Sequence, residues 1–251
     1  MKALGVIPAR YASSRFPGKP LCVIRGKTMI RRVVEQAQQC PDLTAVVVAT
    51  DHHLIEQHVK EFSGQVIMTS PAHKSGTERC AEALARYLED RDATPVDIVV
   101  NIQGDEPFIR PEQISEVITC FQDPSTPIAT LARRIRDSAD LADPHVVKVV
   151  FTRDHQVLYF SRSPVPYFRE SSLREPAGPG QCYEHVGMYG FRTDTLLRLV
   201  KLPETWLETA ESLEQLRWLE HGYPIKIHVT EYPGISIDTP ADLEKIPDTF
   251  R

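Results

Sequence analysis

Three basic residues, Arg10, Arg15 and Lys19, lie within ten positions of the chain that contain no acidic residue. They follow a short apolar run, residues 4–7, which is typical of a first strand. In an open α/β sheet, ligands bind beyond the carboxyl ends of the strands, where loop N–H groups can face a phosphate. Arginine suits bidentate phosphate contacts, and lysine supplies a compact charge. The pattern predicts a phosphate-binding loop; the alternative is a solvated basic loop.

Two common nucleotide-binding signatures are absent from the sequence. Gly18-Lys19 is followed by proline, and Leu21 stands where a Walker A loop ending in Gly26-Lys27-Thr28 would need its first glycine. No G-x-G-x-x-G opens a helix, so a dinucleotide-binding fingerprint is missing as well. The phosphate site that we expect is therefore of another type.

Two aspartates are candidate metal ligands. Asp105 follows the apolar run 97–102 and Gly104, which has no side chain and allows close approach of another backbone. Asp238 precedes Thr239-Pro240, a typical helix start. Carboxylates that face a triphosphate would hold Mg²⁺, so we expect magnesium as the cofactor. The alternatives are a turn aspartate at 105 and, at 238, a residue that favours the following helix through its dipole.

The charge of the chain is divided unevenly. Its 251 residues include 29 Lys and Arg and 34 Asp and Glu, a net charge of −5. Residues 1–34 hold eight basic residues and no acidic one, so the remaining 21 basic and 34 acidic residues give −13. A net negative protein is a poor candidate for a general nucleic-acid binder, so we expect no nucleic-acid partner. A small polyanion suits the basic segment better.

Short apolar runs alternate with segments of helical periodicity, which favours right-handed βαβ units. Residues 76–89 also begin with a capping-box pattern, Ser75-x-x-Glu78. We predict one domain over residues 1–251: an α/β fold with an open, mixed and mainly parallel sheet flanked by helices. An antiparallel excursion is expected at about 150–192. The predicted strands are 4–7, 44–49, 97–102, 146–151, 157–161, 183–192 and 225–229, and the predicted helices are 28–40, 52–62, 76–89, 111–121 and 209–220.

Other features favour a location in the cytoplasm. No apolar run approaches the ~18 residues needed to span a bilayer, so we expect no membrane partner. The five cysteines are odd in number and lack C-x-x-C spacing, which favours reduced thiols. His52, His53 and His58 do not form a convincing metal set and are expected on the surface of a helix.

The sequence resembles a known family across about residues 4–245. Nine segments occur in the same order as in the 3-deoxy-manno-octulosonate cytidylyltransferases, the CMP-Kdo synthetases. CMP-sialic acid synthetases are more distantly similar, and the continuation Arg15–Leu21 resembles the Kdo type. The segments are IPARYASSRFPGKPL, ATDHHLI, SGTER, VVNIQGDEP, VKVV, YFSR, HVGMYGFR, LEQLR and IDTPADL.

The resemblance implies a fold of the nucleotide-diphosphosugar transferase type, a homodimer, and an enzyme that activates Kdo with CTP for lipopolysaccharide biosynthesis. The excursion at about 150–192 would serve sugar binding and dimerisation. Catalysis would involve Arg15, Lys19, Asp105 and Asp238, the two aspartates holding Mg²⁺. The nucleotide would be bound by Pro8, Ala9, Arg10, Arg15, Lys19, Ser75, Arg79 and Gln103. The sugar acid would contact Arg162, His185, Tyr189, Glu214 and Gln215.

Each sugar-side residue also has a simpler interpretation. Arg162 could be a surface strand residue. His185 and Tyr189 would share one face of a strand and could be core or interface residues. Glu214 and Gln215 could lie on the solvated face of a helix. The functional alternatives are a cytidylyltransferase for another acidic sugar, such as a sialic acid or an amino analogue of Kdo, and a non-catalytic nucleotide-binding protein.

Overall fold

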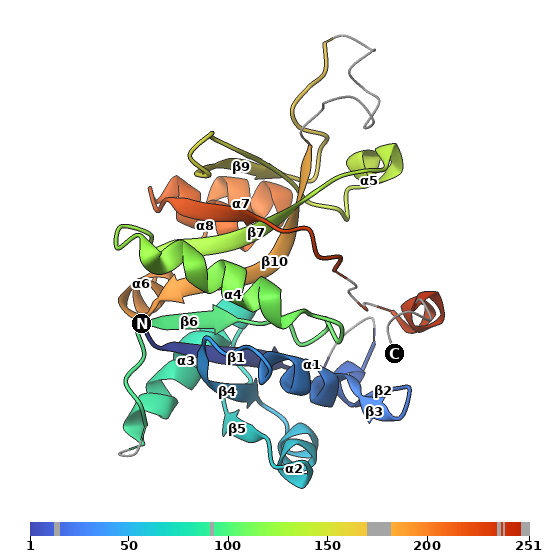
Figure 1. Ribbon diagram of the computed structural model, residues 1–251, viewed down its shortest axis with the longest axis vertical. Helices are drawn as coiled ribbons and strands as arrows, with labels where there is room; N and C mark the ends of the chain where they lie inside the picture. Colours follow the sequence, from blue (N-terminus) through green and yellow to red (C-terminus); the bar gives the residue numbers. More distant parts are fainter. Residues whose placement is uncertain (13–15, 91–92, 170–181, 235–236, 238, 247–251) are drawn as a thin grey trace.

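The computed structural model describes residues 1–12, 16–90, 93–169, 182–234, 237 and 239–246, and a nine-stranded sheet forms its centre (Figure 1). Two of the strands, β8 (Lys148–Phe151) and β9 (Val157–Ser161), lie off the main path. The main path consists of β11 (Ile225–Val229), β7 (Ile128–Arg134), β10 (Tyr183–Arg192), β6 (Ile98–Asn101), β1 (Ala3–Ala9), β4 (Leu43–Thr50) and β5 (Gln65–Met68), in that order.

Strand direction brings several carboxyl ends to one edge of the sheet. β1 pairs in parallel with β4 and β6, β4 with β5, and β7 with β11. β10 is antiparallel to both of its neighbours, β6 and β7, so these two strands run in the same direction. The expected open and mainly parallel sheet is confirmed. The loops that follow β1, β4, β6 and β7 therefore leave from the same edge.

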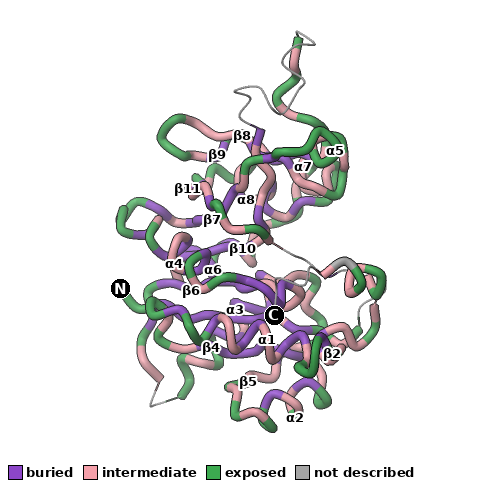
Figure 2. Tube along the Cα trace, turned by 45° about the vertical axis from the view of Figure 1, so that its right-hand side comes forward, coloured by how far each residue is buried: buried purple, intermediate pink, exposed green. Residues whose placement is uncertain are grey.

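Helices cover both faces of the sheet, and the central strands are buried (Figures 1 and 2). The first face packs against α1 (Met29–Ala37), α2 (His53–Glu61) and α4 (Pro111–Thr119). The other packs against α3 (Gly76–Glu89), α6 (Thr193–Leu199) and α8 (Glu214–Glu220). In β1, Ile7 faces the first group, whereas Leu4 and Val6 face the second. Burial on both faces explains why the strand is a continuous apolar run.

The remaining elements are short. They are β2 (Val23–Ile24) and β3 (Lys27–Thr28), which form a separate hairpin, the helices α5 (Ser138–Ala142) and α7 (Trp206–Glu211), and the 3-10 helices Lys19–Leu21, Cys120–Gln122 and Pro240–Lys245. None of the helices in the described part of the chain has the length and apolar content needed to cross a lipid bilayer.

The single helix predicted for residues 209–220 is wrong. α7 ends before Ser212, which takes the left-handed conformation at φ 51°, and α8 begins at Glu214. The side chain of Arg162 donates to the carbonyl oxygens of Glu211 (2.7 Å) and Ser212 (3.3 Å). This contact satisfies carbonyl groups that the interruption leaves without helical partners. Apolar periodicity continues across the break, so it could not reveal the interruption.

The antiparallel segment predicted for about 150–192 consists of two different parts. β8 pairs with β9 and with the start of β10, beside the main path of the sheet. Most of β10 instead lies within the sheet, between β6 and β7. The sequence did not predict β5, β7 or α6. β5 has only four residues, and β7 ends in two arginines, which weakens its apolar pattern.

Candidate active site

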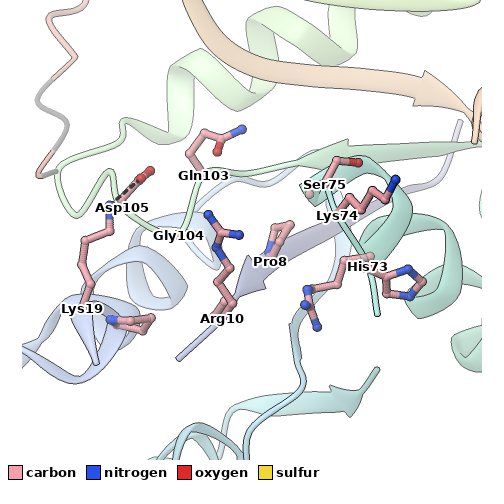
Figure 3. A pocket seen from close by; sticks show the side chains of 13 residues that line it. Pro8, Arg10, Lys19, His73, Lys74, Ser75, Gln103, Gly104 and Asp105 are labelled. Atoms are coloured by element: carbon pink, nitrogen blue, oxygen red, sulfur yellow. Dashed lines mark hydrogen bonds and ion pairs between the residues drawn. The ribbon is translucent and has the colours of Figure 1, made fainter. Parts of the chain in front are cut away.

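A cavity of about 250 Å³ lies at the edge of the sheet where β1 and β6 end (Figure 3). Its walls come from the end of β1, the 3-10 helix Lys19–Leu21, the loop before α3 and the loop after β6. It brings together every predicted nucleotide-binding residue that the structure describes. The lining residues are Pro8, Ala9, Arg10, Lys19, Pro20, His73, Lys74, Ser75, Gly76, Arg79, Gln103, Gly104 and Asp105.

Close approach of two backbones forms one wall of the cavity. β1 and β6 are paired up to Val6 and Asn101, and beyond this pair the end of β1 continues beside the loop after β6. A Cβ atom on Gly104 would lie 2.7 Å from the carbonyl oxygen of Pro8, closer than such atoms can approach. The predicted need for glycine at 104 is therefore confirmed. The contact between Gly104 and Pro8 sets the spacing between the segment before Arg10 and the segment that carries Asp105.

Lys19 and Asp105 form an ion pair at one end of the cavity (Figure 3). The Lys19 Nζ lies 2.8 Å from Asp105 Oδ2 and 3.0 Å from the carbonyl oxygen of Ile237. The Ile237 N–H in turn donates to the Asp105 carbonyl oxygen at 3.0 Å. Ile237 is thus attached directly to the loop after β6. Arg15 and Asp238 lie outside the described residues.

The oxygen donors at this end of the cavity suit a hard cation such as Mg²⁺. Next to Asp105, the Glu106 side chain is buried, and its Oε2 has no hydrogen-bond partner among the described residues. Burial and the adjacent Asp105 carboxylate raise the Glu106 pKa to about 7. A cation held by Asp105 would offset this negative charge. Among the described residues, no three His, Cys, Asp or Glu side chains form a ready-made metal cluster.

Arg79 is fixed by two partners that leave little freedom to its guanidinium. Its Nη2 lies 2.8 Å from Asp51 Oδ2, and its Nη1 lies 2.6 Å from Thr69 Oγ1. Its side chain is only 4% exposed, so the ion pair with Asp51 is well shielded from solvent. Asp51 follows β4 and was not predicted as a site residue. Its place directly after a buried strand was the available signal.

Ser75 connects the cavity to a distant helix. Its hydroxyl accepts from the Glu78 N–H at 3.2 Å, as the capping-box pattern predicted, whereas Glu78 Oε2 accepts from the Lys74 N–H. The Ser75 hydroxyl also donates to Glu214 Oε1 at 2.9 Å, and the Thr77 hydroxyl donates to Glu214 Oε2 at 2.8 Å. The first residue of α8 thus binds directly to the first turn of α3.

The interpretation of Glu214 and Gln215 as a solvated helix face is wrong. Gln215 is 7% exposed. Burial raises the Glu214 pKa, and the hydrogen bonds from Thr77 and Ser75 act in the opposite direction. At the start of α8, buried Gln215 thus follows half-buried Glu214, whose carboxylate contacts Ser75 in the cavity wall.

His185 and Tyr189 share one face of β10, as their spacing predicted, with ring centroids 5.1 Å apart. His185 Nε2 lies 3.0 Å from Thr130 Oγ1, and burial lowers the His185 pKa to about 3, so the imidazole is neutral. Neither residue lines the cavity, although Gln103 connects it to this strand through a 2.7 Å hydrogen bond to the Gly187 carbonyl oxygen. Their sugar-binding role stays a prediction.

Arg162 does not reach the cavity wall. Besides its two contacts at the end of α7, its Nη1 donates to the Pro144 carbonyl oxygen at 3.0 Å. Its backbone N–H also donates to the Glu211 carboxylate at 2.9 Å. In this arrangement Arg162 holds the α7–α8 connection, and its contact with a sugar stays a prediction.

His73 and Lys74 line the cavity but were not predicted as site residues. The His73 Nε2 contacts the Glu82 carboxylate, and its Nδ1 lies 3.7 Å from Glu78 Oε2. Both residues directly precede Ser75, the predicted start of a helix. The loop that leads into a helix N-terminus was therefore the sequence signal that could have found them.

Comparison with known proteins agrees with this geometry. A family model described as cytidylyltransferase matches residues 4–227. A 3-deoxy-manno-octulosonate cytidylyltransferase from Parabacteroides distasonis is 51% identical over 249 residues, covering 98% of this chain and 96% of the relative. A solved CMP:2-keto-3-deoxy-manno-octonic acid synthetase complexed with CTP is 43% identical, with a TM-score of 0.89, and covers 98% of this chain and 96% of that one. A 4-diphosphocytidyl-2C-methyl-D-erythritol synthase from Anaerococcus prevotii, 14% identical with a TM-score of 0.60 and coverage of 97% and 96%, shares the fold alone.

Proposed function

The chain belongs to the 3-deoxy-manno-octulosonate cytidylyltransferase family, and we propose that it transfers the cytidylyl group of CTP to Kdo. The products are CMP-Kdo, used in lipopolysaccharide biosynthesis, and pyrophosphate. The observation that carries this proposal is the cavity at the carboxyl edge of the sheet, which is lined by Arg10 and by the ion pair of Lys19 with Asp105. The likeness to a synthetase solved with CTP supports the choice of nucleotide.

The phosphates of CTP would contact Arg10, Arg15 and Lys19. The last of these is already directed into the cavity by its contacts with Asp105 and Ile237. A phosphate group that enters beside Asp105 would compete for the Lys19 ammonium. The nucleoside would extend toward Ser75, because this residue lies in the cavity wall away from the Lys19–Asp105 pair (Figure 3).

Asp105 and Asp238 would hold Mg²⁺ in this enzyme. The hydrogen bond between Ile237 and Asp105 supports this pairing, because Asp238 is the next residue in the sequence. When bound, the ion supplies positive charge next to the phosphates. The two carboxylates would orient the ion, while Lys19 and the arginines hold the phosphate oxygens.

In the reaction, the anomeric 2-hydroxyl oxygen of the sugar forms a bond to the α-phosphorus of CTP. The bond from that phosphorus to the bridging oxygen breaks, pyrophosphate leaves, and the hydroxyl proton passes to solvent. Such a transfer depends mainly on positioning and charge neutralisation. Glu214 and Gln215 would contact the sugar from the Ser75 side, and His185, Tyr189 and Arg162 would complete its site.

We further propose that the enzyme acts in the cytoplasm as a homodimer. Two apolar side chains support a protein contact near the antiparallel strands: Leu158 of β9 is 61% exposed and Trp206 of α7 is 76% exposed. Exposed apolar side chains that gather in one patch often mark an interface. Light scattering would test the dimer, and a monomer at micromolar concentration would contradict it.

A sugar panel tests the catalytic proposal. The purified protein is incubated with CTP, Mg²⁺ and one sugar at a time: Kdo, its amino analogue or a sialic acid. Pyrophosphate release is measured, and UTP and ATP serve as nucleotide controls. We expect release with CTP and Kdo. The highest kcat/KM with another sugar would contradict the choice of Kdo, and CTP binding without release with any sugar would contradict catalysis.

A further inference from the structure

His52 has a defined position that the proposed mechanism does not use. Instead of lying loosely on a helix surface, it is the N-cap residue of α2, and its Nδ1 accepts from the Leu54 N–H at 3.3 Å. Its ring is stacked on the ring of Tyr11, with centroids 4.1 Å apart and planes 13° from parallel. The opposite end of this short row of rings is His53, 4.8 Å from His52.

Tyr11 lies between the two described cations of the basic loop. It directly follows Arg10, and its carbonyl oxygen accepts from the Gly18 N–H at 3.0 Å, next to Lys19. Gly18 is in the left-handed conformation at φ 70°, which favours glycine. The hydrogen bond joins the two ends of the loop, so the position of Tyr11 affects both cations.

The turn that carries His52 also contacts the opposite wall of the cavity. β1 and β4 are paired to their ends, Ala9 beside Thr50, so the turn after β4 lies next to the loop after β1. In this turn, Asp51 binds Arg79 of α3 while His52 is stacked on Tyr11. Two consecutive residues thus connect the α3 wall with the basic loop.

We propose that the Tyr11–His52 stack holds Arg10 and Lys19 in the arrangement that binds the triphosphate of CTP. Both stacked residues are then positioning residues that do not touch the nucleotide. Cations held in place before binding lose less conformational freedom when the ligand arrives, so affinity increases. This inference rests on the proposed function.

Two substitutions of His52 separate stacking from helix capping. His52→Phe keeps an aromatic ring beside Tyr11 but cannot cap α2, whereas His52→Asn can cap the helix but has no ring. We expect His52→Asn to raise the KM for CTP about 3- to 10-fold with an unchanged KM for Kdo, in line with the strength of an aromatic pair. We expect His52→Phe to have the wild-type KM for CTP and a slightly lower melting temperature.

Two further variants complete the experiment. Tyr11→Leu removes the stack from the other side and should reproduce the rise in KM for CTP. His53→Ala is the matched control, because His53 is the next residue, at the start of α2, and is not stacked on Tyr11. Both KM values of this variant should stay at wild type. Together they distinguish loss of the stack from general damage to the turn.

Two results would overturn the inference. The first is the same KM for CTP in His52→Asn, His52→Phe and the wild type. The second is a rise in the KM for CTP and the KM for Kdo together, in proportion to the decrease in melting temperature. If the wild type releases no pyrophosphate with any sugar, the proposed function fails and this inference fails with it. An active wild type with unresponsive variants refutes the inference alone.

Discussion

The contact between Gly104 and Pro8 gives the sharpest mutational prediction. In Gly104→Ala the new Cβ would lie 2.7 Å from the Pro8 carbonyl oxygen, and real Cβ contacts essentially never fall below 3.0 Å. The atom it meets belongs to the backbone, so no side-chain rotation can relieve the clash. The end of β1 and the loop after β6 must move apart, and these two segments carry Arg10 and Asp105.

The expected size of the effect follows from this geometry. Overpacking of a well-packed site typically costs about 1–3 kcal/mol of the free energy of unfolding. A misplacement of about 1 Å in an active site can cost about 100-fold in rate. A shift of a few tenths of an ångström should therefore lower kcat/KM between about 3- and 10-fold.

Gly187→Ala is a matched control for this experiment. Its Cβ would meet only the Gln103 Cγ, at 3.9 Å, which is an ordinary contact. Pyrophosphate release gives kcat/KM, and urea denaturation followed by circular dichroism gives stability. We expect the control to stay within about 0.5 kcal/mol of wild type, as for substitutions that create no clash. Wild-type activity and stability in Gly104→Ala would refute the reasoning.

Three other predictions concern charge in and near the cavity. Asp105→Asn should stay folded by circular dichroism but lose at least about 100-fold in kcat, because an electrostatic group beside the phosphates is removed; near-normal kcat would exclude the metal-ligand role. Arg10→Glu should weaken CTP binding in calorimetry by more than about 10-fold. Arg31→Glu should leave CTP binding unchanged, because Arg31 pairs with Glu35 at 2.8 Å on α1. In EDTA, the folded state holds more protons than the unfolded chain between pH 4.5 and about 7, because burial raises the Glu106 pKa. The free energy of unfolding should therefore fall by at most about 3 kcal/mol as pH rises across this range. In Glu106→Gln, the free energy of unfolding measured by urea denaturation should change less with pH over this range. The same slope as in the wild type would contradict this prediction.

Most secondary structure was predictable because local pattern determines it. The helix Gly76–Glu89 and the strands Val157–Ser161, Tyr183–Arg192 and Ile225–Val229 have the predicted bounds. Continuous burial or regular apolar spacing leaves a clear signal in such segments. The interruption at Ser212 could not be predicted, because it depends on contacts with Arg162, a residue about 50 positions away.

The sequence by itself determined the mainly parallel α/β fold, the basic loop with Arg10 and Lys19, and the glycine beside Asp105. Each of these depends on neighbouring residues, whose types and spacing are visible in the chain. Only the tertiary structure decided that β10 lies within the main sheet between β6 and β7, and that Glu214 meets Ser75, 139 residues earlier. Strand order and helix packing bring such residues together, because burial of apolar surface selects the arrangement of the whole sheet. The local sequence pattern around each residue does not reveal this arrangement.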